Sequence, residues 1–403
     1  MGKNNSSLVA FLLVFMMGAS TSEAAPRQLE RQKIRQPPKI AKTVLEKADP
    51  QKIVFSKSGI LNPTYAQENI ACVQMPNGKI LAAWETLAPQ NTGVGEAVIY
   101  SPAMQPLASI YFTNPKSNFF IDEIKLIALE NNTVLIAYAD SRELKGKFVI
   151  VNDAGRVVKG PVVFNDSGTS FISLDYLPGK RTIVLAYQKS FSNTGRGEYS
   201  IIGENGEIIR GPIVFNNRGI TQAVGTAVTN GLIFLSYHCS FTNTKVMDPF
   251  GTVVRDEVQY LVKRLVKTQP LAMNDGNVLF IYLNDVSQGI CSILNPQGAL
   301  LKGPTTIMAE TLSGIQASRL KNGNIFISYT RFEGETQKAL CTVLDQNGTR
   351  IKEFKSISDE LSIWDLNIGH TVLSDGRVLI IYGGTQKTGG SLSKQLTGYV
   401  IAN

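Results

Sequence analysis

The sequence predicts an all-β fold that repeats one structural unit, and three observations support this prediction. Apolar, strand-like runs recur along the chain and end on an aromatic residue of the same kind. A tight-turn signal precedes each run, and a second hairpin follows most of them. The aromatic markers, at intervals of 45 to 54 residues, are Trp84, Tyr138, Tyr187, Tyr237, Tyr282, Tyr329 and Tyr382. A period of about 50 residues in strand-rich sequence is typical of a β-propeller, in which each repeat is one blade.

The first hairpin of each repeat carries the clearest signal. Asn77-Gly78 precedes KILAAW, Asn230-Gly231 precedes LIFLSY, and Asp275-Gly276 precedes NVLFIY. Asn-Gly and Asp-Gly supply the positive φ angles that a two-residue hairpin turn needs. The strands after these turns are almost wholly apolar and β-branched, as expected for strands covered on both faces. Neighbouring blades would provide that cover.

The second hairpin completes a four-stranded repeat. It reads KFVIVNDAGRVVKGPVVFN at 147–165 and YSIIGENGEIIRGPIVFN at 199–216. The Gly-Pro pair after the turn indicates an outer edge strand, where a missing N–H is tolerated. The last repeat ends on a single strand at 397–403, and an unpaired strand, KIVFSK, stands at 52–57. The chain from 52 to 403 is therefore predicted to be a seven-bladed β-propeller of four-stranded antiparallel blades. Its ring would be closed by the N-terminal strand joining the C-terminal blade.

Residues 1–24 have the features of a secretory signal peptide. Lys3 gives a positive start, 8–17 is apolar, and Ser22-Glu23-Ala24 offers small residues for cleavage. The apolar run is too short to span a bilayer. A myristoylation pattern also fits the first residues, but the apolar run behind it favours export. We expect a secreted or periplasmic protein that has no integral membrane segment after cleavage.

Residues 25–51 are predicted to form a basic flexible linker. Eight Lys and Arg against three acidic residues give 26–52 a charge of +5, out of +8 for the whole chain. The propeller itself then carries only +3, which argues against a nucleic-acid partner. The linker is interpreted as a solvated tether, and contact with an anionic surface is the alternative.

The repeat resembles a loose group of bacterial exported β-propeller repeat proteins. The matching segments include GKILAAW at 78–84, TVLIAYAD at 133–140 and IVNDAG at 150–155. The unit of that group has the form Gly-x-x-x-x-Ala-Trp/Tyr, followed by a strand that ends in Asp-x-x-Gly. The resemblance implies a propeller and export. The group has no single known activity, so the resemblance assigns no catalytic residue.

The candidate site consists of polar residues that differ from blade to blade. Structural residues repeat in such a fold, whereas a binding site breaks the symmetry. Most of the candidates follow an aromatic marker or lie in the next loop, and these loops gather on one face of a propeller. A solvated polar rim is the alternative interpretation. The predicted ligand-binding residues are Glu85, Asp140, Arg142, Gln188, His238, Asp285, Arg331, Trp364 and Asp365.

The sequence contains no diagnostic catalytic or metal motif, so no catalytic residue, metal or cofactor is predicted. Glu85 and Asp140 on adjacent blades leave open a glycosidase-like carboxylate pair. His238 and His370 are interpreted as structural. Cys291 and Cys341 occupy the same place in adjacent repeats, which predicts buried thiols in the packing between blades and no disulfide.

These observations favour a monomeric binding protein that recognises a glycan or an extracellular protein through its loop face. A polysaccharide hydrolase or lyase of propeller type is the first alternative, and enzymatic activity is the less favoured interpretation. A structural or assembly scaffold that uses the basic linker is the second.

The signal peptide prediction has a direct test. Mass spectrometry of the protein recovered from an exporting bacterium should show that the mature chain starts at Ala25, because cleavage follows Ala24. A recovered chain that keeps Met1 or Gly2 would contradict export by this route.

Overall fold

The computed structural model describes residues 55–401, with several gaps. Contacts divide the chain into the units Met1–Pro37 and Pro38–Asn403, and all described residues belong to the second. The predicted signal peptide, the linker, Trp364 and Asp365 lie outside the described residues. The gaps are 63–65, 89–91, 114–120, 178, 180, 190–194, 221–223, 240, 261–267, 334–335, 354–356, 358–366 and 389–390.

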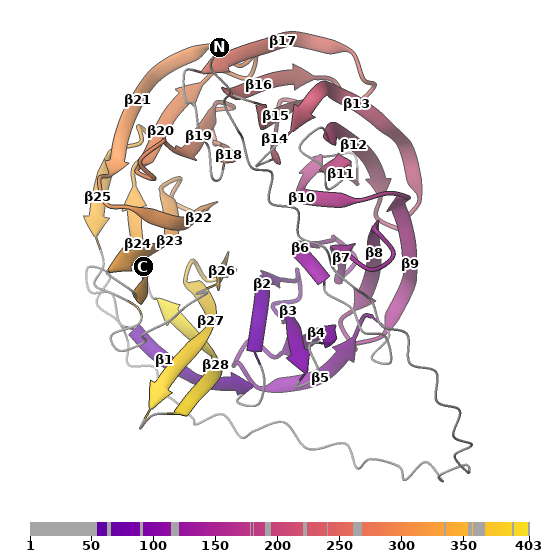
Figure 1. Ribbon diagram of the computed structural model, residues 1–403, viewed down its shortest axis with the longest axis vertical. Coiled ribbons are helices and arrows are strands. Elements are labelled where there is room, and N and C mark those ends of the chain that lie inside the picture. Colours follow the sequence, from indigo (N-terminus) through magenta and orange to yellow (C-terminus); the bar gives the residue numbers. More distant parts are fainter. Residues whose placement is uncertain are drawn as a thin grey trace, which may run out of the picture. The chain divides into compact units, whose positions relative to one another are not determined.

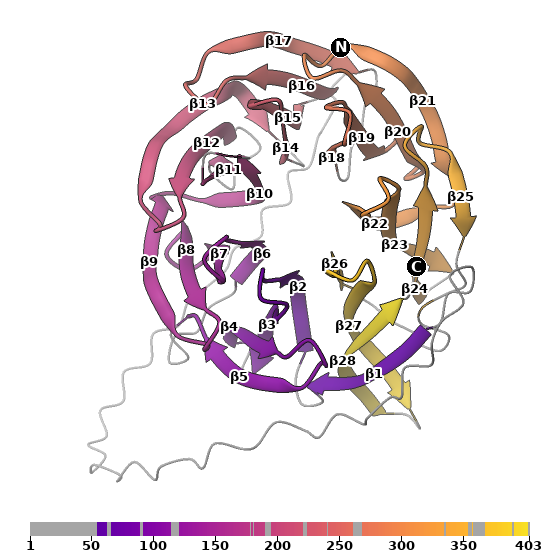
Figure 2. The same ribbon diagram turned by 180° about the vertical axis from the view of Figure 1, so that it is seen from behind.

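The described chain forms four-stranded antiparallel sheets that follow one another around a common axis (Figures 1 and 2). In the sheets built from consecutive strands, the strands run outward from that axis in chain order, so the first strand of each is innermost. Six sheets consist of consecutive strands: β2 (Ala66–Gln74), β3 (Ile80–Ala88), β4 (Thr92–Tyr100) and β5 (Pro106–Tyr111); β6 (Ile121–Ala128), β7 (Thr133–Asp140), β8 (Lys145–Asn152) and β9 (Val157–Asn165); β10 (Thr169–Leu177), β11 (Thr182–Lys189), β12 (Gly195–Gly203) and β13 (Ile208–Ile220); β14 (Val224–Thr229), β15 (Leu232–Cys239), β16 (Phe241–Met247) and β17 (Val253–Tyr260); β18 (Thr268–Ala272), β19 (Val278–Leu283), β20 (Gly289–Leu294) and β21 (Leu300–Met308); β22 (Leu312–Arg319), β23 (Ile325–Glu333), β24 (Thr336–Leu344) and β25 (Arg350–Glu353).

The all-β propeller with four-stranded antiparallel blades agrees with the sequence prediction, but the blade count needs a correction. Seven aromatic markers predicted seven blades, whereas six blades are completed by one continuous stretch of chain. The remaining sheet is a composite of β26 (Asn367–Val372), β27 (Val378–Thr388), β28 (Ser391–Ile401) and β1 (Phe55–Asn62). In it β1 pairs antiparallel with β28, with Phe55 opposite Ile401. The described part of the N-terminal strand is Phe55–Asn62.

The aromatic markers lie inside the second strand of each blade and pack between blades. Tyr187 on β11 contacts Phe164 on β9 of the preceding blade, with ring centroids 5.0 Å apart. Tyr237 and Phe215 repeat this pair one blade later at 5.3 Å. Tilted aromatic pairs of this kind add to the free energy gained from apolar burial. The markers are therefore packing residues, as the sequence indicated.

The Lys-Gly-Pro and Arg-Gly-Pro segments lie on the outermost strands, and the cations of two of them, Arg210 and Lys302, join adjacent blades. Arg210 Nη1 on β13 donates to the Phe250 carbonyl at 3.3 Å. Lys302 Nζ on β21 donates to the Asn347 carbonyl at 2.9 Å. In both cases the acceptor directly precedes the turn glycine of the next blade. The repeated cation is thus a structural feature at the perimeter.

The innermost strands are joined by hydrogen bonds from side chain to backbone. Each of these strands pairs with only one neighbour, so its other edge carries unpaired N–H and C=O groups. Gln269 on β18 satisfies both groups of Ala317 on β22: its Nε2 donates to the carbonyl at 2.9 Å, and its Oε1 accepts the N–H at 2.8 Å. The Gln316 Oε1 accepts the His370 N–H at 3.1 Å. Side chains of one blade thereby saturate the edge of the next.

Three of these strands contain a bulge that aims a side chain or an apolar group at the following blade. Asn69, Glu123 and Phe171 have φ angles of 52°, 56° and 54° and stand at breaks in the register of β2, β6 and β10. The Asn69 Nδ2 donates to the Ile121 carbonyl at 2.9 Å, and the Glu123 Oε2 accepts the Ile172 N–H at 2.5 Å. A bulge re-aims a side chain in this way at the cost of local strain.

All four cysteines are free thiols, and Cys291 and Cys341 are buried in the packing between blades, as predicted. Burial raises the pKa of the Cys291 thiol to about 11, so it stays protonated at neutral pH. Among the described residues, no helix has the length and apolarity that a membrane crossing requires.

The Gln269 bridge gives a stability prediction. Gln269→Leu should lower the free energy of unfolding by about 2 kcal/mol, because both edge groups of Ala317 lose their partner. Gln297→Leu is the matched control, since the side chain of Gln297 is exposed on a turn. Chemical denaturation of both variants measures the difference. Equal stabilities would show that the bridge contributes nothing.

Candidate functional site: the central cavity

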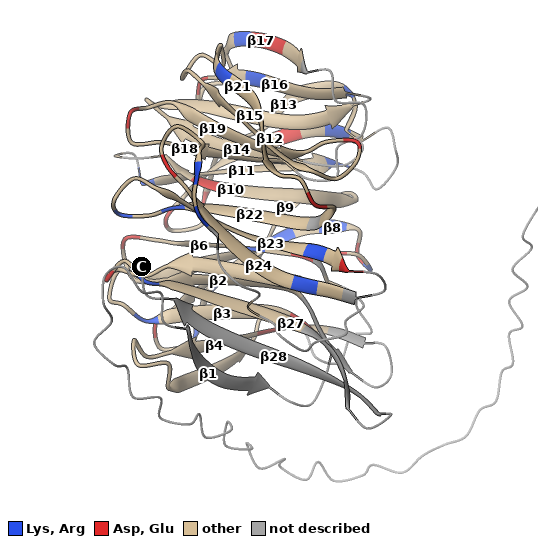
Figure 3. Cartoon of the chain, turned by 90° about the vertical axis from the view of Figure 1, so that its left-hand side faces the viewer, with Lys and Arg blue, Asp and Glu red and all other residues tan. Residues whose placement is uncertain are grey.

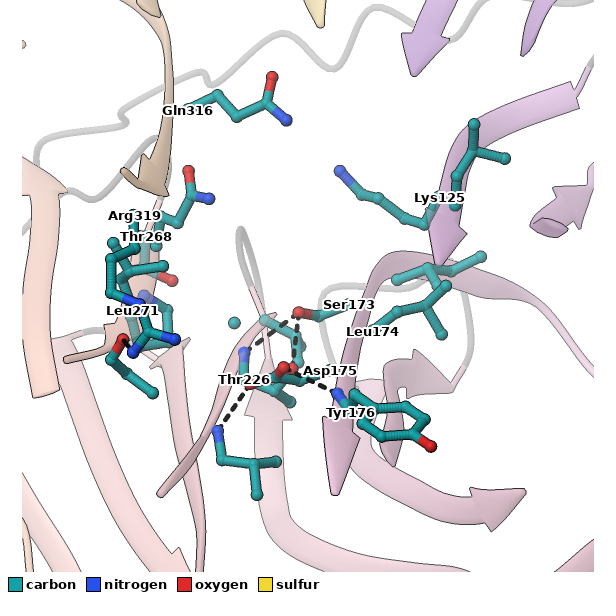
Figure 4. A pocket seen from close by; sticks show the side chains of 18 of the residues that line it. Lys125, Ser173, Leu174, Asp175, Tyr176, Thr226, Thr268, Leu271, Gln316 and Arg319 are labelled. Carbon is teal, nitrogen blue, oxygen red and sulfur yellow. Dashed lines mark hydrogen bonds between the residues drawn. The ribbon is translucent and has the colours of Figure 1, made fainter. Parts of the chain in front are cut away.

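A cavity of about 1170 Å³ lies on the axis of the propeller unit. Its wall includes residues from all seven innermost strands, β2, β6, β10, β14, β18, β22 and β26. The side chains that Figure 4 labels around it include Lys125, Ser173, Asp175, Gln316 and Arg319. Apart from Gln316, which is equivalent to Gln269 of the preceding blade, these side chains do not repeat, so the cavity breaks the symmetry of the scaffold.

Lys125 and Gln316 enter the cavity from opposite walls, β6 and β22 (Figure 4). Lys125 is exposed and makes no ion pair with any described residue. Gln316 is oriented by its Oε1, which accepts the His370 N–H at 3.1 Å, and this leaves its NH₂ group toward the cavity. His370 itself is buried behind the wall, where its Nδ1 lies 2.7 Å from the Ser328 Oγ. Burial lowers the pKa of His370 to about 3, so the imidazole is neutral at physiological pH.

Asp175 and Arg319 form a second polar level, nearer the turns that end the innermost strands. The Asp175 carboxylate accepts the Tyr176 N–H at 2.7 Å and the Val228 N–H at 2.6 Å. Burial raises the pKa of Asp175 to about 6, although both N–H groups and the charge of Arg319 act in the opposite direction. The Arg319 Nη1 donates to the Ala272 carbonyl at 3.1 Å, which directs the exposed guanidinium along the wall.

Hydroxyl groups complete the polar lining, and each is already engaged. The Ser173 Oγ accepts the Thr226 N–H at 3.1 Å and lies 3.0 Å from the Thr226 hydroxyl. The Thr268 hydroxyl lies 3.0 Å from the Ser236 hydroxyl. Apolar side chains, including Leu174 and Leu271, alternate with these groups (Figure 4). The wall thus combines fixed hydrogen-bonding groups with apolar patches, as small-molecule sites do.

Five of the predicted site residues lie inside strands, and four of these are buried, so the alternative interpretation of a solvated rim is wrong for those four. The second strands continue past the aromatic markers, so these side chains are enclosed by the segment that leads to the next blade. The Glu85 carboxylate accepts the Ile121 N–H at 2.9 Å, and the Gln188 Oε1 accepts the Ser170 hydroxyl at 3.0 Å. The exposed fractions are 2% for Glu85, 6% for Asp140, 3% for Gln188 and 4% for His238.

Asp140 and Arg331 belong to ion-pair clusters at the same end of the blades. The Lys147 Nζ lies 2.8 Å from both the Asp140 and the Glu143 carboxylates. Arg331 pairs with Glu310 at 3.7 Å and with Glu333. Figure 3 shows the basic segments of β23 and β24 beside the acidic end of β23. These charges neutralise one another locally.

The remaining predicted residues do not converge on one site. Arg142 and Asp285 are exposed at the loop face, and Trp364 and Asp365 lie outside the described residues. Glu85 and Asp140 are enclosed by separate partners and do not form an open carboxylate pair. Within the described ranges, no group of three His, Cys, Asp or Glu side chains is placed to hold a metal ion.

The cavity residues were missed because the innermost strands lack a regular apolar pattern. A usable signal was present. Lys125, Asp175, Gln269 and Gln316 all stand in the strand that precedes a predicted tight turn, and that strand is innermost in a propeller. Polar residues that differ between repeats in the strand before the tight turn therefore indicate residues that line the axis of the ring.

Comparisons with known proteins identify the fold. No protein-family model matches the chain. No curated protein matches it either. A protein of unknown function from Dyadobacter fermentans has 11% identity and a TM-score of 0.54, with 84% of this chain and 95% of that one covered. A polysaccharide lyase of family PL25, an ulvan lyase, has 9% identity and a TM-score of 0.57, with 85% and 95% covered. The polysaccharide lyase Uly1 has 12% identity and a TM-score of 0.54, with 86% and 91% covered. At these identities the similarity is one of fold.

Asp175 gives a pH prediction. Its pKa in the fold, about 6, exceeds the ordinary value of 3.8, so the folded state binds the proton more tightly. This group therefore stabilises the fold below pH 3.8, and that stabilisation is lost as the pH rises through 6.

Asp175→Asn should remove this contribution. The difference in melting temperature between wild type and variant should change between about pH 4 and pH 6 and stay constant above pH 7. Thermal unfolding in matched buffers measures it. A constant difference across the whole range would show that Asp175 titrates normally.

Proposed function

We propose that the protein is an exported binding protein that holds a glycan in the central cavity of its propeller. The observation that carries this proposal is the cavity, with fixed polar groups separated by apolar side chains. Sugars present hydroxyl groups at their edges and apolar C–H faces, so a wall of this composition matches both. The cavity volume of about 1170 Å³ slightly exceeds the usual range for small-molecule sites, about 300–1000 Å³, which suits a ligand of several sugar rings.

Binding is better supported than catalysis, because the Asp175 carboxylate is held by two backbone N–H groups and neither His370 nor Tyr176 is suited to move a proton. A lyase needs a base that can remove a proton at neutral pH. His370 is buried behind the cavity wall, and its pKa is lowered to about 3. The Tyr176 hydroxyl donates to Glu204 at 2.9 Å, and burial together with that carboxylate raises its pKa. Two structurally similar proteins are polysaccharide lyases, so a polysaccharide is the ligand to assay first.

The proposal is tested by filling the cavity with apolar volume. Leu174→Trp and Leu271→Trp each enlarge an apolar side chain of the wall without changing its charge. Glycan-array binding by the full-length protein should fall at least tenfold in both variants, because the indole ring occupies the space of the ligand.

The control for this test is Val158→Trp, which places the same indole at an exposed position on outer strand β9. It should bind as the wild type does. All proteins are first compared by circular dichroism and melting temperature. Full binding by both cavity variants would exclude the cavity as the site, and an accumulation of unsaturated product from a bound polysaccharide would establish a lyase instead.

A further inference from the structure

The cavity has an asymmetry between its hydrogen-bond donors and acceptors. Its carboxylates are all engaged by groups of the protein: Glu123 accepts the Ile172 N–H, Asp175 accepts two backbone N–H groups, and Asp275 accepts the Asn277 N–H at 3.0 Å and its side-chain amide at 2.7 Å. These acidic side chains act on the backbone of their own or the next blade. Each of them thus has a structural partner within the wall.

The acceptor atoms of the amide side chains in the cavity are also bound by groups of the protein. The Gln269 Oε1 accepts the Ala317 N–H, and the Gln269 Nε2 donates to the carbonyl of the same residue. The Gln316 Oε1 accepts the His370 N–H, whereas its NH₂ group extends into the cavity. The group that Gln316 extends into the cavity is therefore a donor.

Two cations add to this donor set. Lys125 extends into the cavity opposite Gln316, and no described residue forms an ion pair with it. Arg319 uses one nitrogen for the Ala272 carbonyl, which leaves other N–H groups of the exposed guanidinium toward the cavity. Lysine and arginine have no acceptor atoms, so the spare hydrogen-bonding capacity of Lys125, Gln316 and Arg319 consists of donors.

We propose that the ligand of the cavity is an acidic glycan, whose carboxylate or sulfate group binds between Lys125 and Gln316. This inference rests on the proposed function and specifies its ligand class. A neutral sugar hydroxyl both donates and accepts, whereas a carboxylate or sulfate only accepts, which matches a donor-only set. A hydrogen bond between a cation and such an anion is also stronger than one between neutral groups.

Two variants test the donor set without altering the wall. Lys125→Met keeps the length of the side chain and removes the charge. Gln316→Glu keeps an acceptor for the His370 N–H and replaces the donor by a second carboxylate oxygen. Lys159→Met on outer strand β9 is the control, because Lys159 is exposed at the perimeter.

The ligands are matched pairs: oligogalacturonate with its carboxyl-reduced form, and dextran sulfate with dextran. Free galacturonate and sodium sulfate show whether the anion alone suffices. Titration calorimetry of the full-length protein should show binding of at least one acidic polymer and at least tenfold weaker binding of its neutral partner. Each cavity variant should lose about tenfold in affinity for the acidic polymer, and the control should lose none.

The outcomes separate this inference from the proposed function. Equal binding of acidic and neutral partners, blocked by Leu174→Trp but unaffected by Lys125→Met, would overturn the acidic ligand and keep the cavity. Acidic binding that Lys159→Met weakens as much as Lys125→Met would identify general surface attraction and overturn the inference. Absence of binding to every acidic polymer would do the same. Binding of free sulfate or galacturonate as tight as that of the polymer would reassign the site to a small anion.

Discussion

The unpaired edge of each innermost strand is the constraint on which the rest of the structure depends. An edge that faces the axis cannot be covered by a further strand, so side chains of the adjacent blade saturate it. The N–H groups of Thr226, Ala317 and His370 occupy equivalent places and receive an acceptor from Ser173, Gln269 and Gln316. The equivalent residue of β18 is Pro270, which has no N–H, and there Gly225 allows close packing against its ring.

The same constraint explains the chemistry of the cavity. At the axis, side-chain acceptor atoms bind the unpaired backbone N–H groups of the innermost strands. Lysine and arginine side chains have no acceptor atoms, so they do not take part in this pairing. A wall whose side-chain acceptors bind its own backbone N–H groups therefore keeps side-chain donors that are available to a ligand. The structural hydrogen bonds and the candidate site are two results of one arrangement, so the residues that join the blades also set the polarity of the axis.

Much of the fold could be predicted from the sequence, because turns and apolar strands are local signals. The Asn-Gly and Asp-Gly turns marked the first hairpins, and Trp84 and Tyr187 marked strands that pack between blades. The site could not be predicted in the same way. Glu85 and Gln188 follow a marker, and their burial depends on Ile121 at the start of the next blade and on Ile220 at the end of the same blade, which no local pattern describes. Lys125 and Gln316 meet across the axis although nearly half the chain separates them.

The composite sheet has a consequence for how the protein reaches its active form. Because β1 pairs with β28, the first described strand cannot pair until the last one has been synthesised. The ring therefore stays open until nearly the whole chain is present. Contiguous blades can form earlier, since each needs only its own four strands. The central cavity, however, takes its wall from every blade. Under the proposed function, ligand binding is then a property of the finished ring alone, and a prematurely released chain would present folded blades without a binding site.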